Sequence, residues 1–213
     1  MPYDRALMTK SLDSALWLQA LVFRHVAEAA IAELGAEGRT RIARGLREYG
    51  RWRGQELAKT LPENATARDI ALGWNGAELR LPIEKGYPGG GFRPAGNIAE
   101  VSITDSPQWT EWRSLADRTL ARLFMVELLA GVAEGYGRGL VIEHPKFGPD
   151  LKSLWTVRLT TPGGETGPGV LEGTTLDDEA ASRALLLATN RNFAALYYHL
   201  GRALMDGPSL SGE

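Results

Sequence analysis

The sequence contains no cysteine, and this absence removes several kinds of chemistry at once. Disulfides, thiolate metal sites, iron–sulfur clusters and thiol nucleophiles are all excluded. Only three histidines remain as nitrogen ligands or bases. Any catalysis must therefore use oxygen or nitrogen groups.

The sequence also lacks an excess of positive charge, since 24 Lys and Arg residues stand against 26 Asp and Glu. Proteins built to bind nucleic acid or an anionic membrane surface usually carry a basic excess. The most apolar segments are interrupted by Arg24, Glu28, Glu127 and Glu134, so no uncharged run is long enough to span a bilayer. The N-terminus has no apolar region typical of a secretory signal. We expect a cytoplasmic protein that binds neither nucleic acid nor membrane.

The 213 residues, 44% of them hydrophobic, suit one domain with a sizeable core. Two helices are predicted over 11–61, and Gly35 separates them. The first is expected to start at Ser11 or Asp13. Its apolar residues have helical spacing, and we expect them to form the buried face: Leu18, Leu21, Val22, Val26 and Ala29.

The middle of the chain, 74–161, combines β-like runs with one long helical pattern. The helix is predicted over 108–134 and ends at a group of glycines. An exposed loop at 162–176 precedes a C-terminal helix at 177–206. The expected strands lie at 79–83, 98–103, 140–144 and 154–161. The sequence predicts a single α+β domain with two N-terminal helices, a small mainly antiparallel sheet, a central core helix and a long C-terminal helix.

Three residues are candidates for a general base. Glu127 lies among apolar residues of the central helix, where a carboxylate must reach the rim, pair with a cation or face a cavity. A structural ion pair with an arginine is an equally good interpretation. His25 shares the apolar face predicted for the first helix, where a hydrogen-bonded core histidine is the commoner explanation. His144 ends a predicted strand beside a turn, and a surface histidine is as good an interpretation.

A second group of residues is suited to holding a small polar molecule. Trp74, Asn75, Glu78 and Arg80 lie within seven positions, and Trp112 lies on the central helix. An arginine can hold a carboxylate in a two-pronged contact, and a tryptophan supplies a flat apolar wall. The alternative is that Trp74 belongs to the core and that Glu78 and Arg80 are exposed strand residues.

Two further patterns have both structural and functional interpretations. His199 and Asn192 share one stripe of the last helix, which would either line a pocket or bond across an oligomer interface. Gly50 and Gly54 lie on one side of the second helix and permit close approach of another helix or a ligand. Six arginines make that helix basic, and a solvated face with local ion pairs is the favoured interpretation.

No recognised metal-binding or serine-hydrolase motif occurs in the sequence. The glycine run in YPGGGFRPAGN lacks the Lys-Ser/Thr pair of a phosphate loop, so a flexible hairpin or lid is the better interpretation. The sequence therefore implies no cofactor, although a divalent metal held by distant residues is compatible with it.

The segments GLREYGRWRGQELAK and DSPQWTEWRSLADRTLARLFMVELLAGVAEGYGRGLVIEHP resemble the family of L-2-amino-thiazoline-4-carboxylic acid hydrolases. The resemblance spans roughly 15–160. It rests on the order and general composition of the segments rather than on a diagnostic catalytic motif. Many relatives are expected to carry cysteines near the tryptophan-bearing helix, whereas this chain has residues such as Ser106 and Glu127 there. Its long C-terminal helix also extends beyond the family pattern.

The resemblance implies a bacterial enzyme that hydrolyses a non-peptide carbon–nitrogen bond of a small, carboxylate-bearing cyclic amidine. Members convert L-2-aminothiazoline-4-carboxylate into N-carbamoyl-cysteine. Without cysteine the attack must come from water, activated by Glu127, His144 or His25, and Arg80 would hold the substrate carboxylate. The alternative is a sensor or carrier that binds a small molecule without changing it. A homo-oligomer formed through the C-terminal helix is expected in either case.

Overall fold

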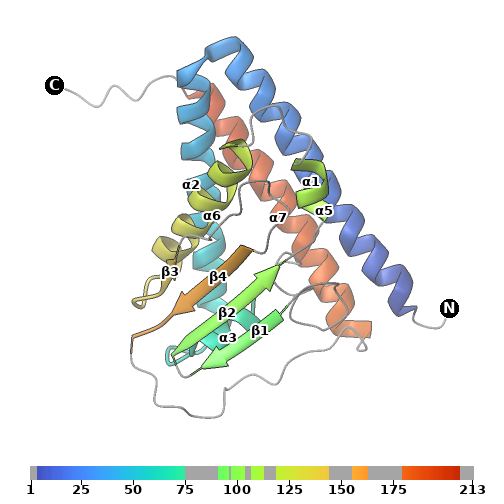
Figure 1. Cartoon of the computed structure of the whole chain (residues 1–213), viewed down its shortest axis with the longest axis vertical. Coiled ribbons are helices and arrows are strands. Elements are labelled where there is room, and N and C mark those ends of the chain that lie inside the picture. The colour runs from blue at the N-terminus through green and yellow to red at the C-terminus, as the bar shows by residue number, and fades with distance from the viewer. Residues whose placement is uncertain are drawn as a thin grey trace.

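The structure, a computed structural model, describes residues 4–74, 91–95, 97–103, 107–112, 119–143, 155–162 and 179–206. The chain begins with two long helices, α1 (Arg5–Leu34) and α2 (Ala36–Thr60), joined at Gly35 (Figure 1). Gly35 has a φ of 59°, which residues with a side chain rarely adopt. The predicted start of α1 at Ser11 or Asp13 is wrong, because the Asp4 carboxylate accepts a hydrogen bond from the Leu7 amide at 3.1 Å and caps the helix earlier.

The buried face of α1 is not the one that the apolar spacing predicted. Leu16, Ala20, Phe23 and Ala27 are the residues that enter the core, whereas Leu18 is 44% exposed. The helix carries apolar residues on both faces, so periodicity alone does not select the inner one. By length and composition, α1 is also the one helix of the described residues that is apolar enough to cross a membrane.

Helices α2 and α6 (Thr119–Tyr136) approach each other through glycine, as the spacing of Gly50 and Gly54 predicted. A Cβ added at Gly131 would lie 2.9 Å from the Gly50 Cα, and one added at Gly54 would lie 2.9 Å from the Gly135 carbonyl carbon. Small residues on both helices let the two backbones touch. This contact forms the centre of the helical layer.

The long helix predicted over 108–134 is two helices in the described residues. A short helix, α5 (Pro107–Trp112), packs on α1, and α6 begins seven positions after its end. Gly137 and Gly139 end α6 with φ values of 64° and 70°, in agreement with the predicted glycine stop.

Four antiparallel strands form one sheet in the order β1-β2-β4-β3. Strands β2 (Ile98–Ile103), β3 (Val141–Glu143) and β4 (Trp155–Thr160) match the predicted runs, while the run at 79–83 lies outside the described residues. Strand β1 (Gly91–Ala95) was missed because its glycine and proline indicate a loop. Its place at the edge of the sheet is where a strand tolerates proline.

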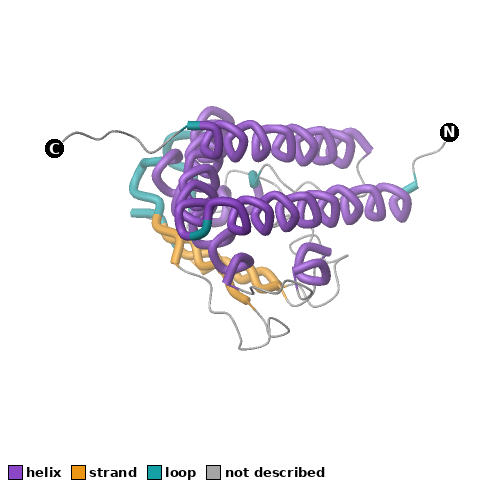
Figure 2. The backbone as a smooth tube through the Cα atoms, turned by 90° about the horizontal axis from the view of Figure 1, so that it is seen from above, coloured by secondary structure: helices purple, strands orange, loops and turns teal. Residues whose placement is uncertain are grey.

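The sheet lies to one side of the helices, and one of its faces is part of the core (Figure 2). Val101, Val157 and Leu159 are fully buried there, beside the short helix α3 (Ala67–Leu72), which begins with a capping box at Thr66. The last helix, α7 (Glu179–Met205), packs between α2 and α1. These elements confirm the predicted α+β class.

Candidate functional site

Glu127 is part of an ion-pair network on the α2–α6 surface. Its carboxylate accepts a hydrogen bond from Arg47 Nη1 at 3.1 Å, and its side chain is 25% exposed. Arg47 also binds Glu134, which in turn accepts from Arg51 Nε at 2.7 Å. The structural ion pair, left open by the sequence, is thus the arrangement observed. Of the other candidate bases, His25 does not lie in this network.

The two arginines lower the pKa of Glu134 from its ordinary value of 4.5 to about 2. The hydrogen bond from Arg47 contributes most, followed by the one from Arg51. Because the folded pKa is depressed, the pair stabilises the fold above pH 4.5 and loses this contribution as the pH falls toward 2. The side chain is 40% exposed, so solvent screening limits the effect to about 1 kcal/mol or less.

We expect Glu134→Gln to lower the free energy of unfolding at neutral pH and to lose this effect in acid. Urea unfolding of both proteins at pH 7 and near the depressed pKa of Glu134 measures the difference. A gap that stays the same at both pH values would contradict the assigned pKa. Arg183→Gln is the matched control, because its pair with Glu179 is local and exposed.

His25 does not lie on the buried face of α1, so its predicted place is wrong. The side chain is exposed, because the core face of the helix is the opposite one. His144 lies outside the described residues, as do Asn75, Glu78 and Arg80.

Trp112 and Trp74 are both buried in the core and do not present their rings to a ligand pocket. Trp112 is fully buried, and its ring centroid lies 4.9 Å from that of Phe124. Trp74 is 3% exposed, and the guanidinium carbon of the buried Arg53 lies 5.3 Å from its ring centroid. This cation–π contact is a structural role. The core interpretation of Trp74, one of the two alternatives, is therefore the observed one.

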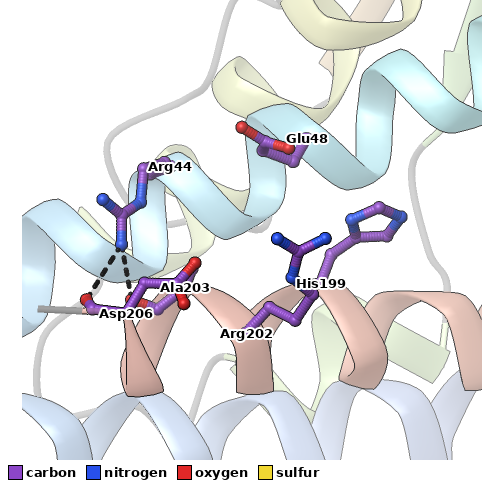
Figure 3. Close-up of a pocket in the computed structure, with 6 residues that line it drawn as sticks. All are labelled: Arg44, Glu48, His199, Arg202, Ala203 and Asp206. Carbon is purple, nitrogen blue, oxygen red and sulfur yellow. Dashed lines mark hydrogen bonds between the residues drawn. The ribbon is translucent and has the colours of Figure 1, made fainter. Parts of the chain in front are cut away.

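A pocket of about 160 Å³ lies elsewhere, between α2 and the last turns of α7 (Figure 3). The two helices come close here because residue 45 is glycine, where a Cβ would lie 3.1 Å from Leu200 Cα. Two arginines of α2 fix the end of α7: Arg41 donates to the Leu204 carbonyl at 2.8 Å and Arg44 to the Ala203 carbonyl at 2.7 Å. Cations suit this end of a helix, where carbonyls lack partners.

Four ionisable side chains and the capping arginine surround this space. Its lining consists of Arg44, Glu48, His199, Arg202, Ala203 and Asp206. In Figure 3, Glu48 projects from α2 toward the His199 and Arg202 side chains on α7. The pocket thus holds both signs of charge together with an imidazole.

His199 is the group in this pocket best suited to proton transfer. Burial lowers its pKa below the ordinary 6.5, the Glu48 carboxylate opposes this shift, and the Arg202 cation adds to it. The imidazole is therefore mainly neutral at pH 7 and has a nitrogen able to accept a proton. The rings of Trp52 and Tyr198 flank it, with centroids at 6.5 and 5.2 Å.

One pattern indicated this pocket in advance, namely the stripe containing His199, which was expected to line a pocket or an interface. Asn192 of that stripe is buried and does not line the pocket. Arg44, Glu48 and Arg202 were missed, because their approach depends on how α2 and α7 cross. Within the described ranges, no group of three or more His, Asp or Glu side chains is arranged to hold a metal ion.

Comparisons with known proteins were made at the levels of family, sequence and structure. No protein-family model matches the chain, and neither does any curated protein or solved structure. The resemblance to the aminothiazoline-carboxylate hydrolases stays a prediction.

Proposed function

We propose that the protein binds a small zwitterionic carboxylate in the pocket between α2 and α7 and hydrolyses it with a water activated by His199. The observation that carries this proposal is the meeting of a neutral imidazole, a guanidinium and a carboxylate around one small space. A water takes up about 30 Å³ in the liquid, so the pocket of about 160 Å³ has room for roughly five waters, or for the reacting part of a small molecule whose remainder projects into solvent.

The charges of the pocket suit a molecule that carries both signs. A cyclic amidine with a carboxylate has a cationic amidinium at one end and an anion at the other. Arg202 is placed to hold the carboxylate, because a guanidinium binds it with two parallel hydrogen bonds. Glu48 is placed to face the amidinium. Arg44 donates one nitrogen to the end of α7 and keeps that wall in place.

The chemistry we propose is addition of water across the carbon–nitrogen double bond of the amidine. His199 removes a proton from the water as the oxygen bonds to the amidine carbon. The tetrahedral carbon then forms a carbonyl as one of its bonds breaks; protonated His199 gives its proton to the leaving sulfur or nitrogen, and the hydroxyl proton passes to water. Loss of a ring sulfur gives a carbamoyl product with a free thiol, and loss of the amino nitrogen gives ammonia. Each route consumes one water. Cleavage of the carbon–sulfur bond gives a single product that is heavier than the substrate by one water, and cleavage of the carbon–nitrogen bond gives ammonia and a ring carbonyl compound.

We expect Arg202→Gln to weaken binding of L-2-aminothiazoline-4-carboxylate by about 10- to 100-fold, the equivalent of a charged hydrogen bond. A thermal-shift titration measures this, since stabilisation depends on ligand concentration over the dissociation constant. Arg183→Gln, an exposed arginine on the same helix, should bind like the wild type. Equal binding by wild type and Arg202→Gln would show that the Arg202 guanidinium does not bind the ligand carboxylate. A ligand bound and left unchanged would favour a sensor or carrier.

A further inference from the structure

Among the described residues, the outer face of α1 carries leucines and small polar side chains and is largely uncovered. Leu7 and Leu18 are 62% and 44% exposed, and only 33% of the most apolar 18-residue window of α1 is buried. The outward positions recur at intervals of four and three residues, as in a coiled coil. They are occupied by Leu7, Ser11, Ser14, Leu18, Leu21 and His25. Each of these six residues lacks a fixed charge.

A groove runs beside this face, between α1 and α7. Its volume is about 500 Å³, and Leu186 and Asn190 of α7 form its far wall. Small residues of α1, among them Ser11, Ser14 and Ala15, form its floor. Small side chains allow the close approach of a second backbone.

The chemistry of the flanks favours a protein helix over a lipid surface. Lys10 flanks the stripe near its start, and Glu28 is the next position of the stripe near its end, where its carboxylate lies 3.4 Å from Arg24 Nε. A membrane surface favours basic flanks, whereas opposite charges at the two ends suit an antiparallel helix with the same sequence. In such a pair, Lys10 of each chain lies beside Glu28 of the other.

We propose that a second copy of this chain packs antiparallel along the outer face of α1, with a two-fold axis between Leu18 and Leu21. Leu18 then meets Leu21 of the second copy, Ser14 meets His25, Ser11 meets Glu28, and Leu7 meets Ala32. Large residues face small ones toward the ends, and two leucines pack at the centre. The contact runs for about 38 Å along the helix, which is the scale of a short antiparallel coiled coil.

The proposal places the predicted homo-oligomer on α1 rather than on the C-terminal helix. Several apolar residues of α7 pack within the chain. Leu200 is buried, and Leu185 and Leu186 pack against Leu12 and Leu16 of α1. The outer face of α1 has no such cover in the described structure.

Single cysteines introduced into this cysteine-free chain test the geometry directly. A disulfide needs Cα atoms within about 7 Å. In the antiparallel pair, residue 18 is offset from its own copy by about 4.5 Å along the axis, and residue 7 by about 38 Å. Leu18→Cys should therefore form a covalent dimer on oxidation, and Leu7→Cys should stay monomeric. A mixture of Leu7→Cys and Ala32→Cys chains should cross-link.

Light scattering on the unmodified chain provides the second measurement. We expect a dimer that Leu18→Lys dissociates and that Val141→Lys, an exposed control on β3, leaves intact. Lys10→Glu should weaken the dimer, and adding Glu28→Lys should restore it. A monomeric wild type, a cross-link at Leu7 alone, or a dimer indifferent to Leu18→Lys would each overturn the proposal. Flotation of a monomer with lipid vesicles would do so as well.

Discussion

Replacing Gly131 by alanine is expected to lower the free energy of unfolding by about 3 kcal/mol, the upper end of what overpacking usually costs. The new methyl group would meet the Arg47 carbonyl and lie 2.9 Å from Gly50 Cα, so α2 and α6 would have to move apart. In a domain of this size the loss corresponds to about 6–12 °C in melting temperature.

Gly201→Ala is the matched control for this prediction. It makes the same change inside a helix, but an added Cβ at this position has no neighbour within 4 Å. Alanine is the better helix former, so the control should gain about 0.5–1 kcal/mol. Urea denaturation of the three proteins measures both effects. Similar stabilities for Gly131→Ala and Gly201→Ala would show that the glycine contact is not tight.

His199→Gln is expected to reduce the turnover number for a cyclic amidine carboxylate by about 10²- to 10⁴-fold, because general base catalysis contributes that much. The glutamine side-chain amide is similar in size to the imidazole, but it does not accept a proton at neutral pH. Affinity should change little, since the carboxylate is held by Arg202. The wild-type rate should fall on the acid side of a pKa below 6.5, as His199 becomes protonated.

The same assay distinguishes His199 from the other candidate bases. His25→Gln and Glu127→Gln should keep the wild-type turnover number, because His25 is exposed on α1 and Glu127 is bound to Arg47. An unchanged turnover number in His199→Gln, or a large loss in Glu127→Gln, would show that His199 is not the general base. Circular dichroism of each variant checks that the fold is retained.

Much of the fold was predictable because local signals agree with it. Helical spacing, the cap at Thr66, the glycines after α6 and the β-branched runs of β2 and β4 all indicate the elements observed. The glycine pair Gly50 and Gly54 even predicted a close helix contact. These features depend on neighbours within a few residues, so one sequence is enough to read them.

The errors have physical causes of two kinds. The inner face of α1 could not be selected, because both faces are apolar and only the tertiary packing distinguishes Phe23 from Leu18. Strand β1 was missed because its pairing with β2 outweighs the loop character of its glycine and proline. In both cases long-range contacts override the local preference.

The candidate site was less predictable than the fold. Arg44 and His199 lie 155 positions apart in the chain, and only the crossing of α2 over α7 brings them to one pocket. Each residue alone is unremarkable: a basic residue on a charged helix and a histidine on an amphipathic one. Trp74 and Trp112 seemed suited to a ligand because large aromatic residues serve cores and pockets equally well.

Product analysis with L-2-aminothiazoline-4-carboxylate tests the proposed function most directly. The chain has no cysteine, so a thiol reagent detects only thiol released from the substrate. Mass spectrometry and an ammonia assay report the other route of breakdown. We predict turnover to a product with one water added, or to ammonia and its partner, with loss of activity in His199→Gln. An unchanged substrate that also fails to stabilise the protein would contradict the proposed function.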